Sequence, residues 1–134
     1  MKLKMTQEEK MLLIKDLSAR LPYAVTVEHT SGFSGTLHDI TVHHMYDDND
    51  NVYDAICYTD FFGDEDSIYI EYFKPYLFPL SSMTKEQKIR CQAIQDMGAS
   101  YSHHLFDRYN EWHLDYSGLI EKGLAIDASG LNIY

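Results

Sequence analysis

The stretch that decides the fold runs from Tyr23 to Phe73 and reads YAVTVEHTSGFSGTLHDITVHHMYDDNDNVYDAICYTDFFGDEDSIYIEYF. Apolar and polar residues alternate in it, and β-branched and aromatic residues are frequent, which is the pattern of half-buried β-strands. Three runs rich in glycine, serine, asparagine or aspartate interrupt the alternation and suit turns. The segment therefore predicts an antiparallel meander of four strands, at residues 23–28, 35–46, 52–59 and 67–73.

Five or so short strands of this kind coil into a small SH3-like partial barrel. The residues leave open whether the sheet stays a plain meander or bends into such a barrel. Residues 74–80, KPYLFPL, contain two prolines, which lack the amide that a central strand needs. We therefore expect this segment to be a connector that packs across the sheet.

Helical patterns lie on both sides of the strands. Residues 6–9, TQEE, and 84–87, TKEQ, have the form of capping boxes, in which two side chains satisfy the first amides of a helix. The first box predicts a helix that Pro22 ends, and the second a helix to about Met97. The second helix has a thin apolar stripe, made of Ile89, Ala93 and Met97.

A third helix is expected from about Ser100 to His113, and a short one from Ser117 to Lys122. The third has an apolar arc made of Leu105, Phe106, Tyr109 and Trp112. The tail from Leu124 to Tyr134 adds an edge strand or lies on the surface.

The sequence predicts one α+β domain over residues 1–134: an N-terminal helix, the meander, and then two to three C-terminal helices. A chain of 134 residues, 45% of them hydrophobic, is long enough to bury a core. We expect the fold to need no metal or organic cofactor. The expected core residues come from most of the elements: Leu13, Leu17, Val25, Ile40, Ile56, Ile70, Leu105 and Trp112.

Charge is distributed unevenly along the chain. Between Leu21 and Phe73 there are eleven carboxylates and not one lysine or arginine, and the formal net charge of the whole chain is −10. A surface of one sign attracts oppositely charged partners and speeds their association. The chain also has eleven tyrosines, several of them in this segment. Tyrosine is frequent both in recognition surfaces and in ordinary strands, and both interpretations stay open.

We expect the acidic, tyrosine-rich sheet to bind a basic protein. Direct binding of nucleic acid by this sheet is disfavoured, since it needs lysine and arginine beside the aromatic rings. The residues predicted to form the partner-binding surface are Asp47, Asp48, Asp50, Asp64, Glu65, Asp66, Tyr53 and Tyr69.

Few residues suggest metal or catalytic chemistry. His103, Asp107 and Glu111 come nearest to a metal site, because their spacing lines them along one helical face. That face is expected to be solvated in any case, so we interpret them as surface groups. The turn at Asp47 begins like an EF-hand loop but lacks the required glycine and final glutamate. A solvated hairpin tip is the preferred interpretation, with a weak cation site between acidic turns as the alternative.

Two stretches toward the end of the chain carry a resemblance. Residues 76–84 read YLFPLSSMT and residues 113–125 read HLDYSGLIEKGLA. Both are similar to stretches in a family of small uncharacterised proteins from gut Bacteroides and their prophages or other mobile elements. The resemblance covers the N-terminal helix and the last third of the chain. It implies a mobile-element origin and brings no activity, cofactor or catalytic residue.

Two classes of function follow. The first is a non-enzymatic binding or accessory protein of a mobile element that uses the acidic sheet against a basic protein. The alternative is a small metal-dependent or otherwise unrecognised enzyme that draws on His103, Asp107, Glu111 or the acidic turns.

The surroundings of the protein are also predicted. Cys57 and Cys91 form no C-x-x-C pair, and the chain shows neither a signal peptide nor an apolar run long enough to span a membrane. We therefore expect a cytoplasmic protein with reduced thiols and no membrane contact. An edge strand and exposed aromatic rings make a symmetric homodimer a further expectation.

Overall fold

The computed structural model describes residues 5–46, 51–59 and 66–134, and it has the predicted α+β fold. Helix α1 (Gln7–Arg20) starts at the predicted capping box. The Thr6 hydroxyl oxygen accepts the Glu9 amide at 3.1 Å, and the Glu9 carboxylate accepts the Thr6 amide at 3.0 Å. A 3-10 turn, η1 (Leu21–Tyr23), contains Pro22 and ends the helix.

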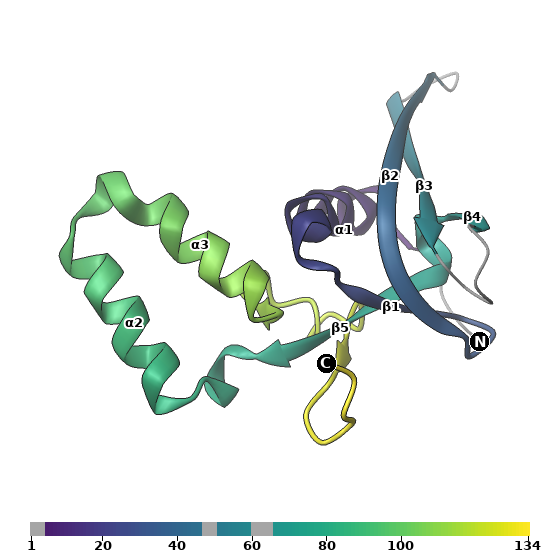
Figure 1. Cartoon of the computed structure of the whole chain (residues 1–134). Coiled ribbons are helices and arrows are strands. Elements are labelled where there is room, and N and C mark those ends of the chain that lie inside the picture. Colours follow the sequence, from purple (N-terminus) through teal and green to yellow (C-terminus); the bar gives the residue numbers. More distant parts are fainter. Residues whose placement is uncertain (1–4, 47–50, 60–65) are drawn as a thin grey trace.

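The predicted four-stranded meander is confirmed. β1 (Thr26–His29), β2 (Ser34–Tyr46), β3 (Asn51–Thr59) and β4 (Asp66–Tyr69) follow one another in antiparallel order. β2 belongs to two ladders, because residues 34–36 pair with β1 and the residues from Leu37 to Tyr46 pair with β3. The register shifts between Leu37 and Asp39, as at a β-bulge, and β2 is strongly curved (Figure 1).

The expectation of a connector at residues 74–80 is wrong. β5 (Phe73–Pro79) is a central strand that pairs with β1, and it also pairs in parallel with β6 (Leu114–Asp115) and β7 (Ile126–Asp127). The prolines fit because each stands where a ladder ends: Pro75 is the last residue paired with β1, and Pro79 is the last of the strand.

The sheet bends without closing. Its strand order is β4-β3-β2-β1-β5-β6, so β5 returns beside β1 after a single 3-10 turn, η3 (Ile70–Tyr72), that follows β4. Within the described ranges β4 and β5 share no ladder. The arrangement is an open, curved sheet with α1 packed against its strands (Figure 1).

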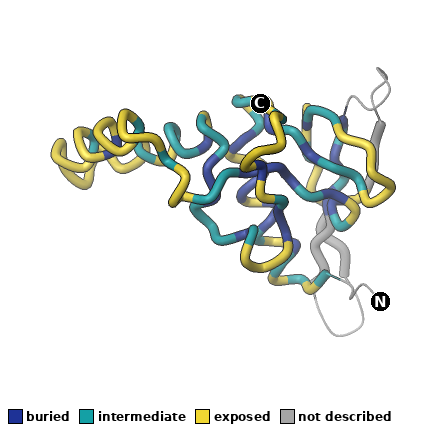
Figure 2. Tube along the Cα trace, turned by 90° about the horizontal axis from the view of Figure 1, so that it is seen from below, coloured by how far each residue is buried: buried dark blue, intermediate teal, exposed yellow. Residues whose placement is uncertain are grey.

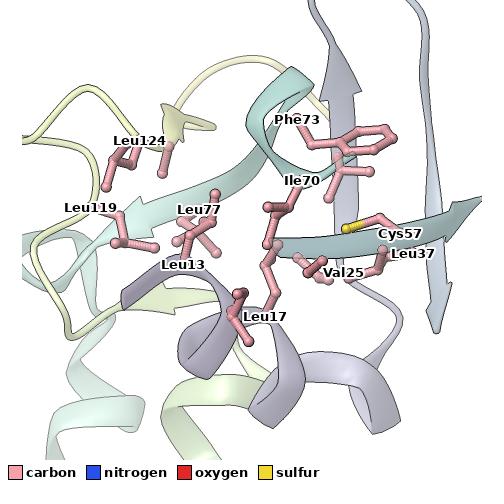
Figure 3. Packing of buried hydrophobic residues seen from close by; sticks show 14 residues of the cluster. Leu13, Leu17, Val25, Leu37, Cys57, Ile70, Phe73, Leu77, Leu119 and Leu124 are labelled. Atoms are coloured by element: carbon pink, nitrogen blue, oxygen red, sulfur yellow. The ribbon is translucent and has the colours of Figure 1, made fainter. Parts of the chain in front are cut away.

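The core lies between α1, the curved sheet and the segment that follows β6 (Figure 3). Of the eight residues expected in it, Leu13, Leu17, Val25 and Ile70 are completely buried. Ile40, Ile56, Leu105 and Trp112 are only partly buried. The cluster also takes in residues that the pattern did not single out: Val27, Leu37, Ala55, Cys57, Phe73, Leu77, Leu119 and Leu124.

Two C-terminal helices form a hairpin that projects from the body (Figures 1 and 2). After a 3-10 turn, η4 (Leu80–Ser82), come α2 (Lys85–Asp96), the 3-10 turn η5 (Ala99–Tyr101) and α3 (Ser102–Glu111). The predicted capping box at Thr84 is present.

The apolar faces of these two helices lie largely outside the core. On the stripe of α2, Ile89 is 60% exposed and Met97 is 56% exposed. In α3, Phe106 is exposed, while Leu105 and Tyr109 are half-buried, as is Trp112 just beyond the helix. Placing Leu105 and Trp112 in the core was therefore wrong, because the apolar arc of α3 faces the hairpin and the neighbouring Tyr116 as much as the body.

Leu17, in the buried core, and Ile89, on the exposed face of α2, test whether the helical hairpin lies outside the core. Leu17→Ala should lower the free energy of unfolding by ~3 kcal/mol, because it leaves a cavity in a closed core. Ile89→Ala removes a similar side chain from an exposed helix face and should cost less than ~0.5 kcal/mol. Urea titrations of the two variants measure both losses, and equal losses would contradict the projecting position of α2.

Candidate interaction surface

The predicted partner-binding residues fall on the meander, and only some of them lie in described parts of the chain. Tyr69 ends β4 and its side chain is 48% exposed. Tyr53 stands in β3, and Asp66 is the first residue of β4. Five of the predicted residues lie outside the described residues: Asp47, Asp48, Asp50, Asp64 and Glu65.

The described part of the meander exposes several apolar side chains. Val42 in β2 is 46% exposed, and Phe33 before β2 and Tyr72 in η3 are exposed as well. The carboxylate of Asp39 is exposed at the position where the β2–β3 register shifts. These residues come from different parts of the segment: Phe33 lies between β1 and β2, Val42 and Asp39 are in β2, and Tyr72 is in η3.

The distal half of the β2–β3 hairpin stands away from the body (Figure 1). In the described residues, β1 pairs with β2 only up to residue 36, and β4 pairs with β3 only at residues 56–59. Beyond these points the hairpin is a two-stranded ribbon.

The residues nearest to a metal site lie along α3. His103 and Glu111 are exposed, Asp107 is half-buried, and Glu111 forms an ion pair with Arg108 at 3.0 Å. Across residues 5–46, 51–59 and 66–134, no three His, Cys, Asp or Glu side chains lie close enough to hold a metal ion. The two cysteines, Cys57 and Cys91, are free and buried.

Two open hollows share Lys74. The larger, about 670 Å³, lies between the start of α1, η3 and the turn at Lys122. The smaller, about 360 Å³, lies between the ends of β1 and β5 and includes Glu28. Burial and the Glu28 carboxylate, which accepts the Tyr76 hydroxyl at 2.5 Å, raise the pKa of Tyr76 to about 12. Tyr76 therefore holds its proton and acts as a hydrogen-bond donor at neutral pH.

A buried polar cluster, which sequence reasoning missed, joins α1 to the end of the chain. The side chains of Asp16 and Arg20 are both 0% exposed, and Arg20 Nε lies 2.6 Å from Asp16 Oδ1. Arg20 Nη2 also donates to the Leu114 carbonyl at 2.7 Å, and the Ser117 hydroxyl donates to Asp16 Oδ2 at 3.0 Å. The guanidinium carbon lies 4.9 Å from the centre of the Tyr116 ring.

The segment after β6 is a set of turns, so the short helix expected from Ser117 to Lys122 is absent. Asp115, which is buried, explains this: its carboxylate accepts the amides of Leu119 at 2.8 Å and Ile120 at 2.9 Å. These bonds hold the chain in a tight turn and place Leu119 in the core.

The tail is fixed to the sheet by Tyr134. Its hydroxyl donates to the Tyr76 carbonyl at 2.8 Å and accepts the Thr26 amide at 2.9 Å. Its ring stacks on His113 with 3.6 Å between the centroids. Burial, helped by the positive charge of Arg20, lowers the pKa of His113 to about 4. The imidazole is therefore neutral at neutral pH.

Comparison with protein families, curated proteins and solved structures finds no match to this chain. No helix among the described residues is long and apolar enough to cross a membrane.

The buried ion pair makes a strong prediction for stability. Arg20→Met leaves the Asp16 carboxylate buried without its partner and should cost ~3–5 kcal/mol in the free energy of unfolding. The double variant Asp16→Leu/Arg20→Met should be more stable than Arg20→Met alone. Arg108→Met, beside the exposed Glu111, is the control and should cost less than ~1 kcal/mol. Denaturant titrations decide between these outcomes, and a harmless Arg20→Met would contradict the burial of the pair.

His113 makes a prediction for pH. Its pKa is lowered from 6.5 to about 4, so between these values the unfolded chain binds more protons than the folded one. Stability should therefore be at its full value above pH 6.5 and fall as the pH drops toward 4. His113→Asn cannot titrate and suits the left-handed backbone at this position, where φ is 56°. In thermal unfolding between pH 7 and pH 5, the His113→Asn variant should lose less stability than the unmodified protein. Equal losses in the two proteins would contradict the lowered pKa of His113.

Proposed function

We propose that the protein is a non-enzymatic binding or accessory protein that presents an acidic, tyrosine-rich sheet to a basic protein. One observation carries the proposal: the segment from Leu21 to Phe73 holds eleven carboxylates and no lysine or arginine. That segment supplies all of β1, β2, β3 and β4, which are consecutive neighbours in one sheet. The excess of negative charge therefore belongs, in sequence, to the segment that contains these four strands.

Physical chemistry supports a basic partner for such a surface. A concentrated negative potential raises the local concentration of cationic groups and steers their approach. Exposed aromatic side chains of the same segment, such as Tyr69 and Tyr72, offer rigid contact area to a partner. Nucleic acid is disfavoured, because its phosphates would be repelled by the same carboxylates.

The cellular setting is part of the same proposal. The resemblance of residues 76–84 and 113–125 to proteins of mobile elements supports a role in such an element. Two buried cysteines that form no disulfide suit the reducing cytoplasm, in which we place the protein.

An anion-exchange experiment on a polylysine matrix tests the location of the acidic surface. The protein should bind immobilised polylysine at low salt and elute as salt rises, because exposed charges are screened over ~8 Å at physiological ionic strength. A variant that carries amides in place of six predicted carboxylates should elute at clearly lower salt. These six are Asp47, Asp48, Asp50, Asp64, Glu65 and Asp66.

The control is a second variant that loses the same number of charges elsewhere. Its six amides replace Glu8, Glu86, Asp96, Asp107, Glu111 and Glu121, all outside the meander. Both variants have the same net charge, so a difference in the salt concentration at which they elute reports where the removed charges lie. Equal elution of the two variants would refute the proposed surface.

A further inference from the structure

The β2–β3 hairpin leaves one long edge of β2 without a neighbouring strand in the described part of the chain. The ladder between β1 and β2 covers residues 34–36, and a bond from the Leu37 amide to the Val25 carbonyl at 3.0 Å extends it. From Asp39 to Tyr46, the only strand paired with β2 in the described parts of the chain is β3. Among the described residues, the opposite edge of β2 therefore has no strand beside its main-chain groups.

Ile40 shows which main-chain groups lie on this edge. Its amide donates to its neighbour Asp39, with 2.8 Å between the nitrogen and Oδ1, and so it points away from β3. Alternate residues of an antiparallel strand direct their amides and carbonyls to the same side. Val42 and His44 therefore share the open edge with Ile40. The Val42 side chain is 46% exposed, so the strand is accessible there.

The charge around this edge restricts what can pair with it. Asp39 stands at its start, and no lysine or arginine occurs between Leu21 and Phe73. A second copy of the chain carries the same excess of negative charge, so electrostatic repulsion opposes its approach to this edge. An extended segment that carries lysine or arginine would instead meet carboxylates.

We propose that the edge of β2 from Asp39 to Tyr46 accepts an extended, basic segment of a partner protein as an additional β-strand. The proposal rests on the proposed function and adds the manner of binding. Main-chain hydrogen bonds to Val42 and His44 supply affinity, and the carboxylates supply the preference for basic side chains. The incoming strand takes over the Ile40 amide, so the Asp39 carboxylate becomes available to a lysine or arginine.

Two synthetic peptides of equal charge test the proposal. The first is an end-blocked octapeptide of alternating lysine and valine, and the second is the same peptide with every internal amide N-methylated, which cannot pair on either edge. The protein should bind the first at least about tenfold more tightly, as two or more main-chain hydrogen bonds would give. Amide hydrogen exchange at Ile40 and Val42 should slow when the first peptide is added.

Val42 provides the matched variants. Val42→Pro removes an amide from the open edge while keeping the ladder to β3, and a proline is tolerated in that position. It should abolish the preference for the unmodified peptide. Val42→Thr keeps the amide and should keep the preference. If Val42→Pro fails to fold, amide exchange at Ile40 and Val42 in the unmodified protein still shows whether the peptide adds as a strand.

The outcomes separate the two proposals. In one outcome both peptides bind equally and in a salt-sensitive way, with unchanged amide exchange at Ile40 and Val42. That result would overturn strand addition and would still agree with the proposed acidic surface. Binding of neither peptide at low salt would overturn both. A dimer that Val42→Pro dissociates would assign the edge to a second copy and likewise overturn the proposal.

Discussion

The rest of the structure depends on one ion pair, between Asp16 and Arg20, that is removed completely from water. The desolvation of each buried ion costs several kcal/mol, and hydrogen bonds from other groups offset part of that cost. Among the described residues, the buried Arg20 Nη1 has no hydrogen-bond partner. The bonds that offset this cost come from the Leu114 carbonyl and the Ser117 hydroxyl, nearly a hundred residues further along the chain. α1 is thereby tied to β6 and to the turn that follows it, and both ends of the chain close on the same core.

This compact centre supports two projecting arms. The β2–β3 ribbon and the α2–α3 hairpin extend from different sides of the body (Figure 1). The α2–α3 hairpin leaves Ile89 and Met97 largely exposed, and along the ribbon one edge of β2 has no strand beside it in the described residues. Segments with few buried contacts are the least stable parts of a domain, and binding surfaces are often drawn from them. The completely buried residues thus lie at the centre, while the arms carry exposed apolar side chains such as Ile89, Met97 and Val42.

Local signals predicted much of this fold, and long-range ones were missed. The alternation between Tyr23 and Phe73 and the two capping boxes depend on neighbouring residues, and they gave the meander and the starts of α1 and α2 correctly. β5 was missed because its two prolines argue against a central strand. That they stand where its ladders end depends on distant strands, which the local sequence does not reveal. Asp16 and Arg20 lie one helical turn apart, and nothing near them in sequence reveals that they bond to Leu114 and Ser117. Of the candidate surface, the acidic bias was evident from composition, but the open edge of β2 appears only once the pairing partners are known.

An open strand edge normally invites aggregation, and proteins protect such edges with charge. Here the protection is one-sided, since the segment from Leu21 to Phe73 has carboxylates and no basic residue. Charge of one sign repels a second copy of the same edge, but it attracts a strand of the opposite sign. The Asp39 carboxylate also occupies the Ile40 amide, one of the donors on that edge. Under the proposed strand addition, the groups that discourage self-pairing are also the groups that select a basic partner.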